Sequence, residues 1–476
     1  MLGWIKCLYG EIVSKVQVNG WLTNEIEIKS GVRQGCPMSP VLFVYVIEPW
    51  IRMLKKDKVV SGVEIPGSGG RSVDVIAYMD DVTILCKSEA GLRRVKLLID
   101  IFSLVSDFRV NMKKSVCKRF GEWKEKDLSQ WEVCKGAIEV LGIKFSENIN
   151  GRESWMVVLE KVNKKIGFWS LRVLSLEGKI LIIKAVLIPI LLYVNNVFPA
   201  PDRILRKIIR NIKLEKLKRQ KIVKKKNKGG KNMVDIEKFL AVKYVSSCVV
   251  LSTKETLDIE KFLAVKYVSS CVVLSTKETL AGCMLKYLAG NSLRKFGLYE
   301  TNLRKPVCFE GPWFYVRIER YIRRNELQGI SKAEWMEKKK VIGIMEGRQE
   351  LEVIGGLNEV ESVNVWKNVS NKELTPRQKD IAWLAVHKCL PTREFQRRRR
   401  LVDSETCPRE ECRGVENVNH LMWECDFAKQ VWRGLGKLIK GLTGVEWLTF
   451  NMMLYDLTNI EKGKARILWF IMCCVK

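Results

Sequence analysis

Two adjacent aspartates between two runs of alternating residues constrain this chain more than any other feature. Apolar side chains alternate with other residues over 73–77 and again over 82–86, and Asp80-Asp81 lies between the two runs. This alternation predicts two half-buried strands joined by a tight turn, and residues 138–145 predict a further strand downstream. Neighbouring carboxylates repel each other, and a divalent cation relieves that repulsion. The segment therefore predicts a hairpin with a candidate metal site, although most such pairs in proteins are merely solvated turn residues.

A second motif precedes the hairpin and gives the aspartate pair a context. It reads Gly31-Val32-Arg33-Gln34-Gly35-Cys36-Pro37-Met38-Ser39-Pro40. Gly35 lets the backbone approach a ligand closely, and Gln34 can hydrogen-bond a base or a sugar. Ser39 as the N-cap and Pro40 at the first helical position predict a helix, with a kink at Pro49. Further upstream, Asn19-Gly20 predicts a hairpin turn. The order of these elements favours a ligand pocket beside the aspartates.

The charge balance indicates a polyanionic partner. Lys and Arg number 83 against 53 Asp and Glu, a net charge of +30, so nucleic acid is the leading partner and an anionic membrane the second. Residues 203–231 predict a basic amphipathic helix followed by a basic loop. A second basic run, 397–400, is more often a solvated face but can contact phosphates. The candidate nucleic-acid-binding residues are Arg206, Lys207, Arg210, Lys224, Lys225, Lys226, Arg397, Arg398, Arg399 and Arg400.

Four residues near the C-terminus have the spacing of a metal site. Cys407, Cys412, His420 and Cys425 form a C-x4-C-x7-H-x4-C pattern. Three thiolates and one imidazole suit a closed tetrahedral Zn²⁺ site. The alternative is that these are ordinary packed cysteines. The other histidine, His387, has no partner at ligand spacing, and we interpret it as a packing residue.

The remaining bulk features indicate an intracellular protein. The chain has 15 cysteines and no signal-peptide pattern at its start, which favours a reducing compartment, with nucleus and cytoplasm both open. The most apolar stretch, 180–194, is interrupted by Lys184 and Pro189 and is shorter than the ~20 residues of a membrane span. We therefore expect a buried helix there and no membrane partner.

Taken together, these motifs resemble the reverse transcriptase of a LINE-type, non-LTR retrotransposon. The Gly31–Pro40 run and Tyr78-Met79-Asp80-Asp81 are similar to the family's motifs, with Met79 where Ala is more usual. Asn111-Met112-Lys113-Lys114-Ser115 resembles its Asn-x-x-Lys-Ser motif. Gly229-Gly230 is similar to a motif after the thumb. The cysteine and histidine pattern resembles the family's zinc-binding region, although its first pair is usually C-x2-C.

The resemblance implies an α+β fold with several parts. They are a partial reverse-transcriptase palm, an antiparallel sheet with helices, followed by a mainly helical thumb, a helical connection and a small zinc-binding module. We expect the palm over 1–145, the thumb-like region with the basic segment over 146–231 and the connection over 232–370. The zinc-binding region is expected over 371–445 and a helical tail over 446–476. The connection contains a duplication, because 235–257 recurs unchanged as 258–280.

The resemblance also implies a reaction and its participants. Asp80 and Asp81 would be the catalytic residues and would bind two Mg²⁺ ions for nucleotidyl transfer, and the module would hold one Zn²⁺. The expected partners are an RNA template, a DNA primer or target and deoxynucleoside triphosphates, while the oligomeric state is not indicated. The residues implied for nucleotide binding are Gln34, Gly35, Tyr78 and Lys114.

One part of the family's catalytic centre has no counterpart in the sequence. A further palm carboxylate is expected upstream of the Gln34-Gly35 motif, but the first aspartate is Asp57, and Glu11 is the only acid before Asn19-Gly20. We therefore expect an N-terminally truncated chain. Three readings remain: an active polymerase, a catalytically inactive remnant that binds nucleic acid, and a zinc-containing binding module. The missing carboxylate favours the second for the lone chain, and the sequence before Met1 would discriminate.

Overall fold

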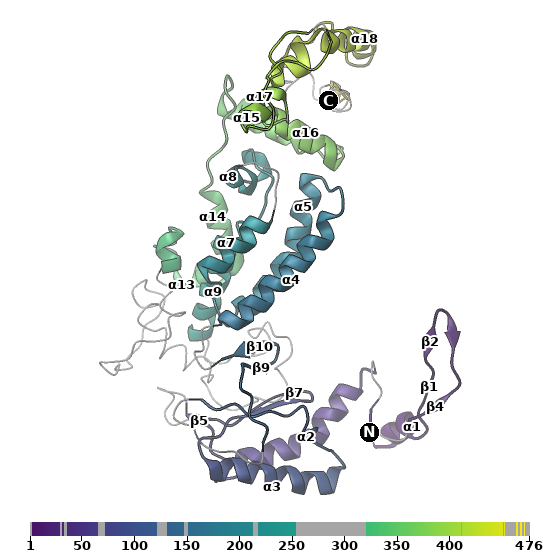
Figure 1. Cartoon of the computed structure of the whole chain (residues 1–476), viewed down its shortest axis with the longest axis vertical. Coiled ribbons are helices and arrows are strands. Elements are labelled where there is room, and N and C mark those ends of the chain that lie inside the picture. Colours follow the sequence, from purple (N-terminus) through teal and green to yellow (C-terminus); the bar gives the residue numbers. More distant parts are fainter. Residues whose placement is uncertain are drawn as a thin grey trace. The chain divides into compact units, whose positions relative to one another are not determined.

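The computed structural model describes most of the chain as two compact units (Figure 1). The first unit comprises Met1–Glu153 and Ser247–Ile318, and the second comprises Ser154–Ser246 and Glu319–Lys476. Among the described residues, no helix has the length and apolar character needed to cross a membrane. The described residues are 2–28, 31–32, 36–64, 72–120, 131–146, 151–212, 218–253, 320–372, 374–410, 412–450, 452, 463–464, 467–468 and 471.

The first unit begins with a helix and two small antiparallel ladders. Its elements are α1 (Leu2–Tyr9), β1 (Val13–Ser14) paired with β4 (Ile26–Glu27), and β2 (Gln17–Val18) paired with β3 (Trp21–Leu22). Asn19 and Gly20 form the turn between β2 and β3 with φ values of 49° and 89°. Asparagine and glycine tolerate this left-handed conformation better than other residues. The predicted Asn-Gly hairpin is confirmed.

Two helices and one hairpin form the core of the first unit. The elements are α2 (Ser39–Lys56), α3 (Glu89–Ser106), β7 (Val75–Tyr78) and β8 (Asp81–Ile84), with a small ladder of β5 (Val63–Glu64) and β6 (Ser72–Val73). Trp50 and Leu54 of α2 pack with Val75 of β7 and with Val95 and Leu98 of α3. Removing these apolar side chains from water is the main force that holds the unit together.

The start of α2 differs from the prediction. Met38 occupies the cap position and caps no backbone group with its side chain, while Ser39 is the first helical residue. Ser39 is buried, and its hydroxyl lies 3.0 Å from the Tyr9 hydroxyl. The Ser39 side chain therefore contacts Tyr9 and does not cap the helix. The predicted helix is present, and it runs through Pro49 as a single element.

A second difference concerns residues 138–145, which the sequence predicts as one strand. The structure has a hairpin of β9 (Ile138–Val140) and β10 (Ile143–Phe145). Leu141 and Gly142 form its turn with φ values of 50° and 76°. A two-residue turn with positive φ at both positions matches the twist of a tight hairpin. The single-strand prediction was therefore wrong, because it ignored the turn chemistry of Leu141-Gly142.

The second unit is mainly helical. It starts with α4 (Arg152–Ser170), followed by α5 (Leu176–Ile182), a π turn η2 (Ile183–Leu187) and α6 (Ile188–Asn195). The last three form the buried apolar helix predicted for 180–194, in which Leu191 and Val194 are buried. Pro189 cannot donate the backbone bond that an α-helix needs one turn back, and the π turn ends two residues before it.

The other helices of the second unit follow in two groups. The first is α7 (Asp202–Asn211), α8 (Arg219–Val223), the 3₁₀ turn η3 (Lys226–Lys228) and α9 (Ile236–Thr253). The first duplicated copy reaches α9, and the second lies outside the described residues. The later group is α13 (Lys332–Met336), α14 (Lys338–Gly347), α15 (Glu359–Val369), α16 (Pro376–Val386), α17 (Arg393–Arg397), the π turn η4 (His420–Glu424) and α18 (Asp426–Thr443).

Local capping explains where several of these helices begin. Ser331, Asn358 and Thr375 each form a capping box at the start of α13, α15 and α16. In a capping box the cap side chain accepts from the third helical N–H while that residue's side chain accepts from the cap N–H. Pro376 after Thr375 adds a preset φ at the first helical position.

Candidate functional site

The aspartate pair lies at the tip of the β7–β8 hairpin. The two strands pair antiparallel with Tyr78 opposite Asp81, so that Met79 and Asp80 form the turn. Val75 and Ala77 point into the core, whereas Asp80 and Asp81 are exposed. Met79 takes a φ of 49°, a conformation that glycine adopts more readily than methionine. The predicted hairpin is confirmed, and it presents two neighbouring carboxylates, the oxygen ligands that Mg²⁺ prefers.

The other residues predicted for nucleotide binding are only partly visible. Gln34 and Gly35 lie outside the described residues. Tyr78 is the last residue of β7 and is half-buried. Lys114 is exposed in a turn, and its backbone N–H donates to the Asn111 carbonyl at 3.0 Å. Within the described part of the chain, no third acidic residue joins Asp80 and Asp81 in a metal-binding group.

The predicted zinc ligands converge in the second unit. One ligand atom each from Cys407, Cys412, His420 and Cys425 lies within 4.8 Å of all the others. The Cys412 Sγ is 3.2 Å from the His420 Nε2. Ligand bonds of ~2.0 to 2.3 Å at tetrahedral angles place neighbouring donors about 3.3 to 3.8 Å apart. The donor set and its spacing therefore fit one Zn²⁺, which would be held by three thiolates and one imidazole.

Backbone contacts hold these ligands in place. The Cys407 N–H donates to the Gly414 carbonyl at 2.9 Å, beside a bridge between Thr406 and Val415. The His420 N–H donates to the Asn417 side chain at 2.8 Å. A Cβ on Gly414 would lie 2.6 Å from the His420 ring, so only glycine leaves room for the imidazole. The sequence pattern alone did not reveal this role of Gly414.

The electrostatic surroundings of the cysteines differ. Burial raises the pKa of Cys407. Burial also opposes ionisation of Cys425, but hydrogen bonds from the Arg409 side chain and from the backbone N–H groups of Phe427 and Ala428 outweigh it and lower the pKa. Because zinc binds thiolates and not thiols, the surroundings of Cys425 favour its ligand form.

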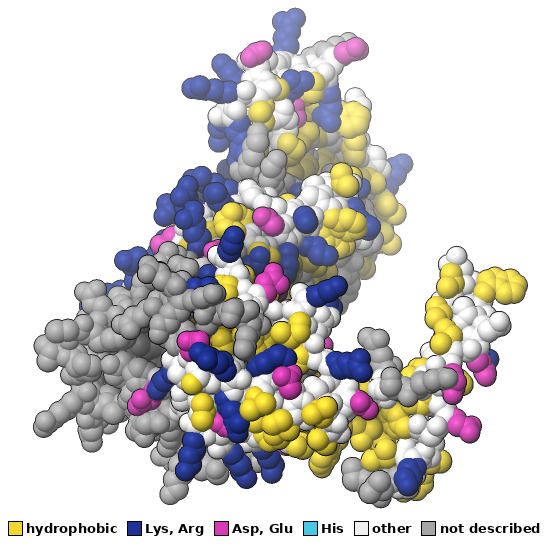
Figure 2. Space-filling model, turned by 60° about the horizontal axis from the view of Figure 1, so that its bottom comes forward, with side chains coloured by type: hydrophobic (Ala, Val, Ile, Leu, Met, Phe, Trp, Pro, Cys, Tyr) yellow, Lys and Arg dark blue, Asp and Glu magenta, His cyan; other side chains and the backbone are white. Residues whose placement is uncertain are grey.

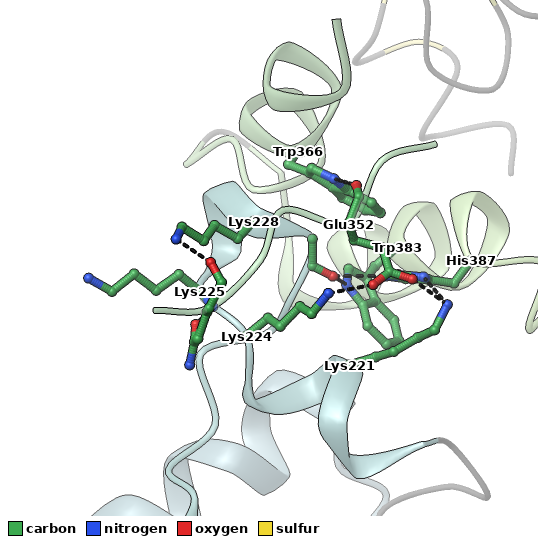
Figure 3. Close-up of polar contacts among 10 residues, drawn as sticks. Lys221, Lys224, Lys225, Lys228, Glu352, Trp366, Trp383 and His387 are labelled. Atoms are coloured by element: carbon green, nitrogen blue, oxygen red, sulfur yellow. Dashed lines mark hydrogen bonds and ion pairs between the residues drawn. The ribbon is translucent and has the colours of Figure 1, made fainter. Parts of the chain in front are cut away.

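The lysine-rich segment after α8 makes ion pairs inside the second unit (Figure 3). Lys221 and Lys224 both bind Glu352, with N···O distances of 2.7 and 2.6 Å. Burial raises the pKa of Glu352, but the hydrogen bonds from the two ammonium groups outweigh burial and lower it to about 2. Lys225 pairs with Glu346 at 3.1 Å, and Lys226 pairs with Glu177. Three predicted nucleic-acid-binding lysines, 224–226, thus have carboxylate partners within the chain.

Gly229 and Gly230 lie where a larger residue would not fit. A Cβ on Gly229 would lie 2.8 Å from the Trp366 ring, and one on Gly230 would lie 1.9 Å from the Lys224 carbonyl oxygen. Trp383 donates from Nε1 to the Gly229 carbonyl at 2.9 Å. Next to this turn, Lys231 forms a buried ion pair with Asp380 at 2.6 Å. The motif therefore fastens the segment to α15 and α16 (Figure 3).

His387 has a larger role than the packing predicted for it. Its ring stacks on Trp366 at 4.9 Å between centroids and lies 4.2 Å from Trp383. Its Nε2 is 2.8 Å from the Gly229 carbonyl oxygen, and its Nδ1 is 3.4 Å from the Lys221 Nζ. Packing is confirmed, but the sequence offered no signal for these polar contacts, because the partners lie far away along the chain.

The other predicted nucleic-acid-binding residues are more open. Arg206, Lys207 and Arg210 are exposed on α7, opposite the buried Ile204 and Ile208. Figure 2 shows lysine and arginine side chains spread over the surface on one side of the molecule. The run 397–400 begins at the last residue of α17. Arg397 pairs with Glu405 at 3.4 Å, and Arg398 pairs with Glu394. Arg399 lies 4.5 Å from the Phe395 ring centre, and Arg400 is exposed.

Comparisons with known proteins agree with the two sites. Residues 1–145 match the reverse transcriptase (RNA-dependent DNA polymerase) family, and residues 356–432 match the family described as zinc-binding in reverse transcriptase. The chain is 30% identical over 192 residues to a Xenopus laevis protein described as transposon TX1 uncharacterized 149 kDa protein. That alignment covers 38% of this chain and 14% of the relative. Residues 1–145 are therefore similar to a reverse transcriptase domain, residues 356–432 are similar to the zinc-binding region found in reverse transcriptases, and part of the chain is similar to a transposon protein.

Proposed function

We propose that this chain binds nucleic acid, supplies Asp80 and Asp81 as Mg²⁺ ligands of the polymerase centre and holds one structural Zn²⁺. The observation that carries the polymerase assignment is the β7–β8 hairpin, which presents the two carboxylates at a turn within the family's reverse transcriptase region. In the family, two Mg²⁺ ions activate the attacking 3′-hydroxyl and stabilise the leaving pyrophosphate. The proposed substrates are an RNA template, a DNA primer or target and deoxynucleoside triphosphates.

Primer extension tests the catalytic part of the proposal. Two metal ions at about 3.5 to 4 Å need several converging carboxylates, and Asp80 and Asp81 provide two. We therefore expect the 476-residue polypeptide to bind a primer on an RNA template without extending it. A polypeptide that also contains a palm strand with a further aspartate should extend the primer, and Asp80→Asn should abolish this. Robust synthesis by the 476 residues alone, lost in Asp80→Asn, would refute the view that this polypeptide is inactive.

The α7 face is the proposed phosphate-binding surface. Arg206, Lys207 and Arg210 have no ion pair with a described residue, unlike Lys224 to Lys226. Affinity for duplex or single strands should fall steeply with salt, because each neutralised phosphate releases counterions. Changing the three residues to Gln should reduce the slope of log K against log salt by up to about three. The matched control removes three exposed charges elsewhere in the second unit, by changing Lys332, Lys339 and Lys437 to Gln.

An equal loss in both triple variants would show a nonspecific charge effect and would contradict the α7 assignment. An unchanged slope in the α7 variant would contradict it as well. Binding that does not depend on salt would remove nucleic acid as the partner that the +30 charge indicates.

Metal analysis tests the zinc part of the proposal. We expect one Zn²⁺ per chain and loss of that metal in His420→Ala, because three thiolates alone leave the tetrahedral site open. Cys7→Ser is the control, since Cys7 is an exposed cysteine outside the cluster. Chelation should also loosen the region around α18, because ligand binding energy contributes to folding. Full zinc content in His420→Ala would show that His420 is not a zinc ligand and would contradict the four-residue assignment.

A further inference from the structure

Arg409 contacts three of the four residues in the proposed zinc centre. It lies in the four-residue segment between Cys407 and Cys412. Its backbone N–H donates to the Cys407 sulfur, and its carbonyl accepts from the Cys412 N–H at 3.2 Å. Its guanidinium donates from Nη1 to the Cys425 Sγ at 3.1 Å. The residue therefore connects the first cysteine pair to the last ligand through both its backbone and its side chain.

An aromatic ring fixes the guanidinium in this position. The Arg409 Cζ lies 4.4 Å from the centre of the Phe427 ring. Phe427 is 55% exposed, which is unusual for a phenylalanine whose only task is to fill a core. Arginine stacks on aromatic faces and donates from a rigid planar fork, whereas the lysine ammonium is a compact, strongly hydrated charge. The exposed ring thus contacts the same guanidinium that donates to the Cys425 sulfur.

The charge of the site gives this contact its energetic importance. Three thiolates and one Zn²⁺ have a formal charge of minus one, and the sulfurs of Cys407 and Cys425 are largely shielded from water. A buried net charge is unfavourable unless it is paired and hydrogen-bonded. A charge-assisted N–H···S bond supplies both, and it orients the sulfur for the metal.

We infer that Arg409 is a positioning residue that sets the zinc affinity of this centre through its hydrogen bond to the Cys425 thiolate. The inference rests on the proposed zinc binding by the four ligand residues. Partners of this kind usually change metal affinity about 10- to 100-fold when removed.

The experiment measures zinc affinity of the full chain by competition with a chromophoric chelator. Arg409→Met keeps the length and apolar stem of the side chain and removes the charge and the donors. Its zinc affinity should fall about 10-fold or more. Phe427→Leu keeps the arginine and removes the ring, and its affinity should fall about threefold. Arg413→Met is the matched control, because it removes the same charge next to the ligand Cys412 from an exposed position, and its affinity should stay unchanged.

A cobalt-substituted protein gives a second readout that packing alone does not move. Loss of an N–H···S bond leaves the Cys425 thiolate a stronger electron donor. The thiolate-to-cobalt charge-transfer band should therefore move to longer wavelength in Arg409→Met but not in Arg413→Met. This separates an effect at the sulfur from a general loosening of the module.

The outcomes distinguish this inference from the zinc assignment itself. If the unaltered chain binds no zinc, the proposed zinc centre is wrong. If it binds zinc and Arg409→Met binds it within twofold of the same affinity, only the role of Arg409 is overturned. Should Arg409→Met not fold, Arg409→Lys decides: wild-type affinity in that variant overturns the inference, because a point charge would then suffice, and a loss of about 10-fold supports it.

Discussion

Both ring nitrogens of His387 have polar partners, and these partners constrain its protonation. Its Nδ1 faces the Lys221 ammonium at 3.4 Å, and its Nε2 faces the Gly229 carbonyl oxygen at 2.8 Å. An ammonium can only donate and a carbonyl can only accept, so the ring must be neutral with its hydrogen on Nε2. Burial is the main cause that lowers the pKa of His387 to about 4, and Lys221 adds to it, while the Gly229 carbonyl and Glu352 act in the opposite direction.

The direction of the pH effect follows from this lowered pKa. In the unfolded chain a histidine titrates at its ordinary value of 6.5, so acidification protonates the unfolded state first. His387 therefore contributes its full stability above pH 6.5, and this stability is lost as the pH falls toward about 4. The shift corresponds to about 3 kcal/mol in total, of which about 2 kcal/mol is lost by pH 5.

The test compares the chain with His387→Gln. Glutamine keeps one donor and one acceptor but does not titrate. The variant should be less stable at pH 8, because it loses stacking on Trp366 and Trp383, worth about 1 to 2 kcal/mol. Urea denaturation of both zinc-loaded proteins should show this difference narrowing by about 2 kcal/mol between pH 8 and pH 5. All other titrating groups are common to both chains and cancel.

Nuclear magnetic resonance of labelled histidine provides a direct check, because the chain has only 2 histidines and His387→Gln identifies the signals. The signal of His387 should remain that of a neutral ring at pH 5. Titration near pH 6.5 would refute the reasoning. So would an identical pH dependence of stability in the two proteins, which would mean that burial of this ring does not favour its neutral form.

Three further changes test close packing and buried charge. Gly414→Ala should weaken zinc binding while Gly436→Ala, within α18, should not, because only the first Cβ would meet the His420 ring; chelator competition measures this. Gly230→Ala should destabilise the second unit by more than about 1 kcal/mol in urea denaturation, since its Cβ would overlap the Lys224 carbonyl. Lys231→Met should cost about 3 to 5 kcal/mol by leaving Asp380 unpaired, and adding Asp380→Asn should recover part of it.

Features encoded in a few neighbouring residues could be predicted from the sequence. The Asn19-Gly20 turn and the hairpin around Asp80-Asp81 were predicted correctly, because strand alternation and turn chemistry are local. The convergence of the zinc ligands was also predicted, since the donor types and their order along the chain restrict how they can meet. Leu141 and Ser39 were misjudged where a turn or a tertiary hydrogen bond prevailed over a local preference.

The lysines at 224–226 show why the remaining features could not be predicted. The sequence presents them as a basic run, and a basic run is usually a solvated or phosphate-binding face. In the structure, Lys224 binds Glu352, which lies 128 residues away along the chain, and Lys225 binds Glu346. No local pattern indicates such partners, because they depend on how α14 and α15 pack.

A cation that already has a carboxylate partner gains less from a phosphate, because it must first give up the existing pair. The ion pair between Lys224 and Glu352 is also partly buried. If a phosphate replaced the carboxylate, Lys224 would have to move toward water or Glu352 would lose this partner while partly buried. Arg206, Lys207 and Arg210 on α7 have no such cost, since they are exposed and make no ion pair with a described residue. The same net charge therefore has two roles: the loop after α8 uses it to fasten helices within the second unit, and α7 leaves it available for a polyanion.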